Sequence, residues 1–300
     1  MSDFVNGFWS MYVAGLVVVS ILACLVLLVM SGKAKAMTAS DNTTGHVWDD
    51  DLREMNNPLP RWWSYLFVLT VIFGFGYLAL YPGLGSYPGL LGWTSSGLHA
   101  AEIKQGEEQT APVYARFANM TPQDIAKDPA AMAIGERLYS NNCAQCHASD
   151  AQGNKGFPNL TDGDWLHGGA PEKITETIQL GRVGNMPPMA AAVGTEEDVK
   201  NVAQYVLSLS GSPHDAAKAA LGKEKFAVCA ACHGADGKGM QALGSANLTD
   251  NIWLHGFGEK AIIERINNGV VNVMPAQAYH LTEPQIKVLT SYIWGLSNKQ

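Results

Sequence analysis

The stretch Cys143-Ala144-Gln145-Cys146-His147 constrains this chain more than any other part of it. Two thiols three residues apart on one helical turn can each form a thioether with a haem vinyl group, and the next residue, a histidine, can then bind the iron. The pattern occurs again, 86 residues downstream, as Cys229-Ala230-Ala231-Cys232-His233. The sequence therefore predicts two covalently bound haem c groups, attached through Cys143 and Cys146 and through Cys229 and Cys232.

The duplication extends beyond the two motifs. Residues 159–162 (Asn-Leu-Thr-Asp) and 165–168 (Trp-Leu-His-Gly) recur 88 residues later, as does the Met186-Pro187 pair. The change from 86 to 88 assigns a two-residue length difference to the Gly-rich loop after the motif. A repeat on this scale predicts two tandem haem domains. A zinc site is the alternative for a Cys/His cluster, but the chain lacks a second Cys/His pair at zinc-finger spacing.

Each iron needs two axial ligands, and the motif histidines His147 and His233 are predicted to supply one to each iron. Met186 and Met274 are the candidates for the opposite side, because each precedes a proline and each follows the histidine of its own motif. Imidazole with thioether is a ligand pair suited to electron transfer. An iron closed on both sides has no position for a substrate, so no catalytic residue is predicted.

Other ligands remain open from the residues alone. Met189 lies close to Met186, but its repeat counterpart is Gln277. His167 and His255 occupy matching repeat positions and would give bis-imidazole ligation. Alternatively, these two histidines do not bind iron and lie beside Trp165 and Trp253. The indole N–H groups of these tryptophans are predicted to donate to a partner such as a haem propionate.

Two apolar runs predict membrane crossings. Phe8–Met30 and Trp62–Tyr81 contain no Asp, Glu, Lys or Arg, and each is long enough to cross a hydrocarbon core of about 30 Å as a helix. A cleaved signal peptide is the alternative for the first run, but the chain before it has no basic residue and the run is too long. Cys24, the fifth cysteine, lies in this run and is expected to be a small buried apolar residue.

The basic residues predict the orientation of these helices. Lys33, Lys35, Arg53 and Arg61 lie between the two apolar runs, and no basic residue follows the second run until Lys104. The positive-inside rule then puts the intervening segment in the cytoplasm and both termini in the periplasm. The net charge of −7 gives no reason to expect a nucleic-acid partner.

These observations together predict an all-α chain with two transmembrane helices and two tandem class I cytochrome c domains. Amphipathic helices are expected over 130–141 and 221–228, running into the motifs, and from Thr195 and Thr282 to the end of each haem domain. The expected segments are a first transmembrane helix (1–31), a cytoplasmic loop (32–61), a second transmembrane helix (62–82), a periplasmic linker interrupted by prolines (83–130), and cytochrome c domains at 131–210 and 211–300.

This organisation resembles the dihaem subunit (CcoP or FixP) of cbb3-type cytochrome c oxidases, over essentially the whole chain. The most specific stretch is residues 46–54, His-Val-Trp-Asp-Asp-Asp-Leu-Arg-Glu, followed by residues 57–63, Asn-Pro-Leu-Pro-Arg-Trp-Trp. The repeated haem motifs, Trp-Leu segments and Met-Pro pairs also match. The first apolar run is a departure, since some members have only the second helix. The histidines of the two Trp-Leu-His-Gly segments are another, where the family pattern has tyrosine.

The resemblance implies an electron-entry subunit in the bacterial inner membrane. A periplasmic cytochrome c, soluble or anchored, would be the donor, and a monohaem cytochrome c subunit would be the next carrier. A catalytic subunit with haem b and copper would reduce oxygen, and membrane lipid would surround the helices. A membrane-anchored dihaem cytochrome serving a periplasmic dehydrogenase is the alternative function, and a peroxidase would need one iron without a methionine ligand.

Overall fold

The computed structural model describes residues 4, 6–33, 43–55 and 59–298. The chain divides into two compact units, residues 1–109 and residues 110–300. The first unit contains both predicted membrane helices, and the second contains both haem motifs.

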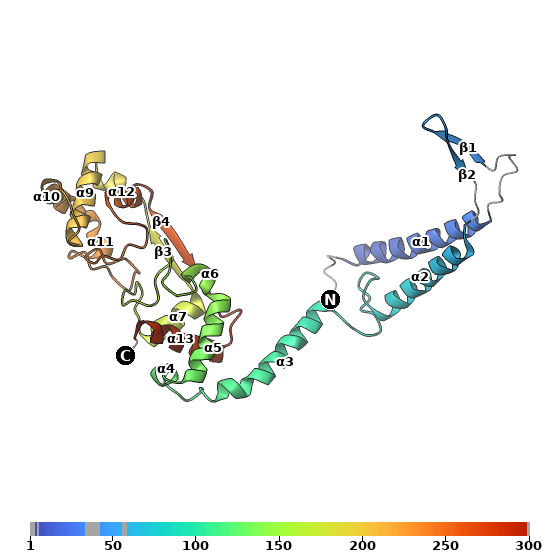
Figure 1. Ribbon diagram of the computed structural model, residues 1–300, viewed down its shortest axis with the longest axis horizontal. Helices are drawn as coiled ribbons and strands as arrows, with labels where there is room; N and C mark the ends of the chain where they lie inside the picture. The colour runs from blue at the N-terminus through green and yellow to red at the C-terminus, as the bar shows by residue number, and fades with distance from the viewer. Residues whose placement is uncertain (1–3, 5, 34–42, 56–58, 299–300) are drawn as a thin grey trace. The chain divides into compact units, whose positions relative to one another are not determined.

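The first unit contains two long apolar helices, a short hairpin and the first part of a third helix (Figure 1). Helices α1 (Gly7–Gly32) and α2 (Arg61–Leu80) are long and apolar enough to cross a membrane, and neither buries a residue within the chain. Between them, β1 (Thr43–Trp48) pairs antiparallel with β2 (Leu52–Met55). An exposed apolar helix surface of this kind is stable in contact with lipid, because every backbone polar group is bonded within the helix.

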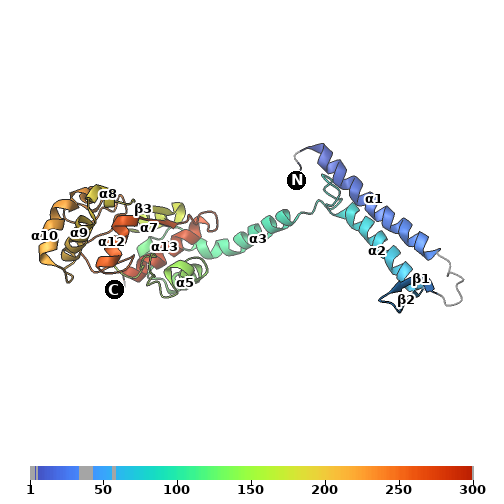
Figure 2. The same cartoon turned by 90° about the horizontal axis from the view of Figure 1, so that it is seen from above.

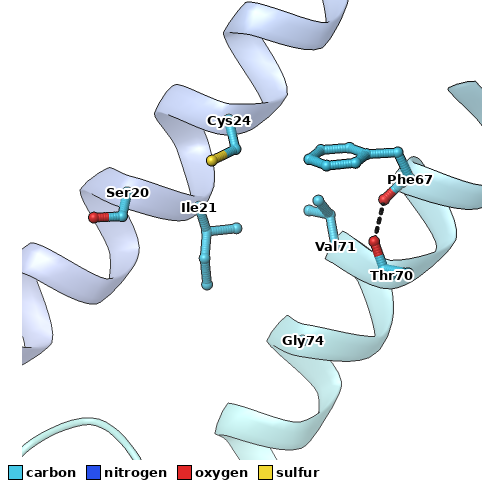
Figure 3. A pocket seen from close by; sticks show the side chains of 7 residues that line it. All are labelled: Ser20, Ile21, Cys24, Phe67, Thr70, Val71 and Gly74. Atoms are coloured by element: carbon cyan, nitrogen blue, oxygen red, sulfur yellow. Dashed lines mark hydrogen bonds between the residues drawn. The ribbon is translucent and has the colours of Figure 1, made fainter.

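A cavity of about 260 Å³ lies between α1 and α2 (Figure 3). The Thr70 hydroxyl in its wall donates to the Phe67 carbonyl of the same helix (2.7 Å), so this polar group is satisfied without leaving the helix. Cys24 lines the cavity and is exposed. The prediction that this cysteine is buried was therefore wrong for the part of the chain that the structure describes, in which α1 packs on α2 and leaves Cys24 exposed.

Helix α3 (Ser95–Ala115) occupies much of the segment predicted as a linker. Pro112 lies inside this helix and does not end it, contrary to the expectation that prolines interrupt any long element here. The helix buries no residue, so water can bond the Glu108 carbonyl that the proline leaves without its helical partner.

The second unit is mostly helical, and the predicted motif helices and closing helices are present. Thr195 and Thr282 each form a capping box at the start of a closing helix, which confirms the two start positions. In chain order the elements are α4 (Pro122–Ile125), α5 (Pro129–Asn142), α6 (Ala144–His147), α7 (Pro171–Leu180), β3 (Arg182–Met186), α8 (Ala190–Val193), α9 (Glu196–Leu209), α10 (Ala216–Lys225), η1 (Phe226–Val228), α11 (Ala230–His233), α12 (Glu259–Asn268), β4 (Val270–Met274) and α13 (Glu283–Ser297).

The two closing helices are exchanged between the repeats. Helix α13, at the end of the second repeat, packs on α4, α5 and α7 of the first. Helix α9, at the end of the first repeat, packs on α10 and α12 of the second. Figures 1 and 2 show the two groups of helices on either side of the short β3–β4 sheet. Each haem motif is thus enclosed by helices from both halves of the sequence.

Two apolar cores result from this exchange. We call the cluster around the first motif the first core; its buried residues are Tyr139, Ala151, Ile174, Ile178, Leu281, Ile286, Leu289 and Ile293. We call the cluster around the second motif the second core; its buried residues are Val193, Val199, Val202, Ala203, Val206, Leu207, Phe226, Ile262 and Ile266. The expected domain boundary between residues 210 and 211 divides the sequence into two continuous segments. Each core, in contrast, contains residues from both sides of that boundary.

Strands β3 and β4 form a two-stranded antiparallel ribbon at the crossover. Arg182 pairs with Met274, and Met186 pairs with Val270, so each strand ends at a methionine. This ribbon and the β1–β2 hairpin correct the prediction of an all-α chain. The strands are short, and the alternation of half-buried and exposed residues along them extends over only five positions, which is too short a pattern to stand out in the sequence.

Candidate haem centres

The first motif lies on a single helical turn at the end of α5. Helix α6 begins directly after Cys143, whose side chain is partly buried in the first core, whereas Cys146 is exposed. Burial is the main reason that the pKa of the Cys143 thiol rises to about 11. Cys229 and Cys232 repeat this arrangement in the second core, and burial raises the pKa of Cys229. Each motif therefore offers one thiol at the core and one at the surface.

Both motif histidines are held in the same orientation. The His147 ring donates through Nδ1 to the Pro158 carbonyl (2.9 Å), and the His233 ring does so to the Ala246 carbonyl (2.9 Å). A carbonyl can only accept, so Nδ1 carries the proton and Nε2 keeps a free lone pair. Burial lowers the pKa of His147, which favours the neutral ring. A neutral imidazole oriented by its other nitrogen is the form that binds iron.

The methionines lie at opposite ends of the β3–β4 ribbon and on its half-buried face. They are separated by four residues along the strands, about 14 Å at 3.4 Å per residue. Each is followed by a segment that bonds to the core of the other repeat. The Gln277 N–H donates to the Ile178 carbonyl at the end of α7 (2.9 Å), and the Met189 N–H donates to the Ile266 carbonyl in α12 (2.8 Å).

The ribbon thus brings Met274 to the first core and Met186 to the second. Sequence reasoning paired each methionine with the histidine of its own motif, and the packing of the two strands supports the opposite pairing. Met189 packs on the second core, where its carbonyl accepts from the N–H groups of Ala192 and Val193 at the start of α8. The repeated sequence does not indicate which methionine lies at which core, because both copies contain the same order of elements.

The two Trp-Leu-His-Gly segments stay with their own cores. Trp165 packs on the first core and Trp253 on the second. The amide of Asn272 on β4 donates to His255 Nε2 (2.9 Å), so this histidine is already engaged by the ribbon. The His167 ring lies against the loop of the second repeat at Gly244. His167 therefore touches the other repeat, whereas His255 bonds to the ribbon strand of its own repeat.

Three side chains around these segments could not be predicted from the motifs. They are Asn272, Arg182 on β3, and Arg265 on α12. Sequence alignment of the repeats puts Thr177, not an arginine, opposite Arg265, so no repeated signal identifies either arginine.

The family described as cytochrome C oxidase, cbb3-type, subunit III matches residues 130–206 and again residues 217–293. The N-terminal domain of cytochrome oxidase-cbb3, FixP, matches residues 40–88. The cbb3-type cytochrome c oxidase subunit CcoP of Rubrivivax gelatinosus is 66% identical over 99% of this chain and 97% of its own length. This chain belongs to the CcoP/FixP family.

Other CcoP/FixP proteins are similar over most of their length. The FixP subunit of Azorhizobium caulinodans is 42% identical over 86% of this chain and 94% of its own length. The CcoP subunit of Cereibacter sphaeroides is 38% identical over 85% of this chain and 94% of its own length. Membership confirms the resemblance inferred from residues 46–63 and from the repeated motifs, and it implies haem c.

The side chains around both cores fit a haem c group. In the second core, Trp253 Nε1 and Arg265 Nε are buried donors without a partner among the described residues, and a propionate carboxylate would satisfy both. The motif thiols, the oriented imidazoles and the apolar side chains of the cores complete the chemistry that a covalently attached porphyrin needs.

Proposed function

We propose that this chain carries two haem c groups and is the electron-transfer subunit of a cbb3-type cytochrome c oxidase. Haem c supplies reversible one-electron chemistry, and the protein supplies the attachment, the axial ligands and the distance between the two centres. The observation that carries the proposal is the repeated motif, with the same Nδ1-to-carbonyl bond at both histidines, in a chain of the CcoP/FixP family.

The proposed attachment residues are Cys143 and Cys146 for the first haem and Cys229 and Cys232 for the second. We infer crossed axial ligation, in which His147 shares its iron with Met274 and His233 shares its iron with Met186. The contacts of residues 277 and 189 with α7 and α12 support this pairing. A two-stranded ribbon that provided both thioethers would tie the two haem sites to one structural element.

Two membrane crossings with both termini in the periplasm are part of this proposal. The two apolar helices and the basic residues between them support it. The proposed neighbours are a catalytic subunit with haem b and copper, a monohaem cytochrome c subunit and lipid. A periplasmic cytochrome c is the proposed donor.

Purification of the intact complex from membranes tests the function. We expect the chain to co-purify with oxygen-reducing haem b subunits and to carry two covalent haems by mass. Reduction of these haems by a cytochrome c should precede oxygen consumption in stopped-flow measurements. Co-purification with a periplasmic dehydrogenase in place of haem b subunits would support the alternative, which the oxidase names of the relatives do not favour.

A further inference from the structure

An arginine stands beside each Trp-Leu-His-Gly segment. Burial first, and then the guanidinium of Arg182, lowers the pKa of His167. Burial and then Arg265 lower the pKa of His255 in the same way. The side chains of the two arginines are similarly covered, with 21% of Arg182 and 24% of Arg265 exposed. Each arginine is therefore a half-buried positive charge at the edge of one core.

The two guanidinium groups reach equivalent places from non-equivalent positions in the repeat. Arg182 extends from β3, donating through Nε to the Thr177 hydroxyl (2.9 Å) and through Nη1 to Glu176 (2.9 Å). Arg265 occupies the position on α12 that Thr177 occupies on α7, and its Nη2 donates to Glu264 (2.6 Å). Glu264 is in turn the repeat counterpart of Glu176. The same charge pair is thus built twice by different routes.

Around Arg265, the bond to Glu264 leaves two N–H groups unsatisfied. Arg265 Nε and Trp253 Nε1 are both buried and unpartnered among the described residues, so two N–H groups are available on the covered side of this cluster. Glu264 is half exposed, which leaves it partly screened by water as a counter-charge. Buried donors of this strength are nearly always satisfied in folded proteins, and a carboxylate satisfies an arginine and an indole N–H at once.

We propose that Arg182 holds the propionate charge of the first haem and that Arg265 holds that of the second. The proposal rests on the proposed function, since it needs a porphyrin in each core. Strand β3 then contributes to both haems, because Arg182 and Met186 lie on the same face at its two ends. A positive charge near the porphyrin opposes the charge of the oxidised iron, so each arginine raises the potential of its own haem.

Redox titration of the detergent-solubilised full chain tests the proposal. The two waves are assigned with Met274→His and Met186→His, each of which lowers one wave. Arg182→Gln is expected to weaken reduction of the first haem about tenfold, which is 59 mV for one electron, and to leave the second unchanged. Arg265→Gln should do the reverse. Arg137→Gln removes an exposed charge from α5 and is the matched control, with neither wave moving.

The lysine variants separate charge from structure. Arg182→Lys and Arg265→Lys keep the charge and lose the planar fork, so each should shift its own wave by less than half as much as glutamine. If either glutamine variant fails to attach haem, the lysine variant decides by whether it moves its own wave alone. The proposal is overturned if, in variants that carry two covalent haems, the waves move no more than in Arg137→Gln or both waves move together. Either result leaves the proposed function standing. Fewer than two covalent haems in the parent chain would overturn the proposed function.

Discussion

The first and second cores are built from the same parts but differ in how closely their exchanged helices approach. In the second core, Gly222 of α10 meets the backbone of α9, and an added Cβ would lie 2.0 Å from the Asn201 carbonyl oxygen. In the first core, Gly135 of α5 meets a side chain, and an added Cβ would lie 2.5 Å from Tyr292 Cβ. The first core also receives a third apolar cluster, formed by Phe117, Ile125, Ala131 and Val288.

This difference shows which contacts the exchange depends on. Aromatic pairs close both crossings, Tyr139 with Tyr292 at 5.8 Å between ring centroids and Phe226 with Tyr205 at 5.2 Å. A second-repeat helix therefore completes the first core, and a first-repeat helix completes the second. Variants that affect one core without the other break or sharpen this comparison.

Removal of α13 should have the largest effect. A chain ending at Gln277 loses Ile286, Leu289 and Ile293, which are 0–4% exposed in the first core. Each contributes about 1.5–3 kcal/mol by burial, so their loss consumes most of the stability of a typical domain. We expect the first haem to lose its Met-to-iron charge-transfer band while the second keeps it, as measured by magnetic circular dichroism. Loss at the second haem alone would contradict the exchange.

Substitution of the methionines by histidine should have the next largest effect. Met274→His is expected to lower the potential of the haem attached at Cys143 and Cys146 by more than 59 mV. This shift corresponds to a more than tenfold change in the equilibrium constant for one-electron reduction. Met186→His should lower that of the other haem. Chains with one motif disabled by Cys→Ala changes identify the remaining wave. If each variant changes the haem of its own repeat, crossed ligation is wrong.

Alanine at the two crossing glycines should separate the cores by stability. Gly222→Ala is expected to destabilise the second core by about 3 kcal/mol, because a backbone carbonyl cannot move aside. Gly135→Ala should cost the first core about 1–3 kcal/mol, because Tyr292 Cβ is bonded to the backbone of α13 and moves only with that helix. Thermal unfolding followed at the two haems measures both. Gly106→Ala, with nothing within 4 Å of the added Cβ, is the control and should not destabilise the chain.

A change at low pH should be the smallest effect. Hydrogen bonds from Lys173 and Arg182 lower the pKa of Glu176 to about 2, from an ordinary 4.5. A carboxylate with a depressed pKa stabilises the folded state above its unfolded pKa, and this contribution is lost as the pH falls from about 4.5 towards 2. Glu176→Gln should flatten the acid limb of the first core's unfolding curve in that window. Glu224→Gln, an exposed carboxylate on α10, serves as the comparison and should leave the limb unchanged.

The sequence was sufficient for the helices and for locating the two Cys-x-x-Cys-His motifs. Apolar runs, capping residues and the duplicated motif are local signals, and α1, α2, α5, α9 and α13 lie where these signals predict. The β3–β4 ribbon and the exchange of closing helices depend on contacts between residues that are far apart in the sequence. A closing helix with the same apolar face fits either core, so the sequence pattern is equally compatible with both arrangements. Arg182 was not found for the same reason, since its partners lie on α7 and its role has no counterpart at position 270.

The exchanged helix α13 has a consequence for biosynthesis. The residues of α13 that close the first core are synthesised after the second motif, so the first core is completed only after that motif has been made. A frameshift within α13 would consequently damage the first core before the second, and neither repeat alone contains all the residues of one core.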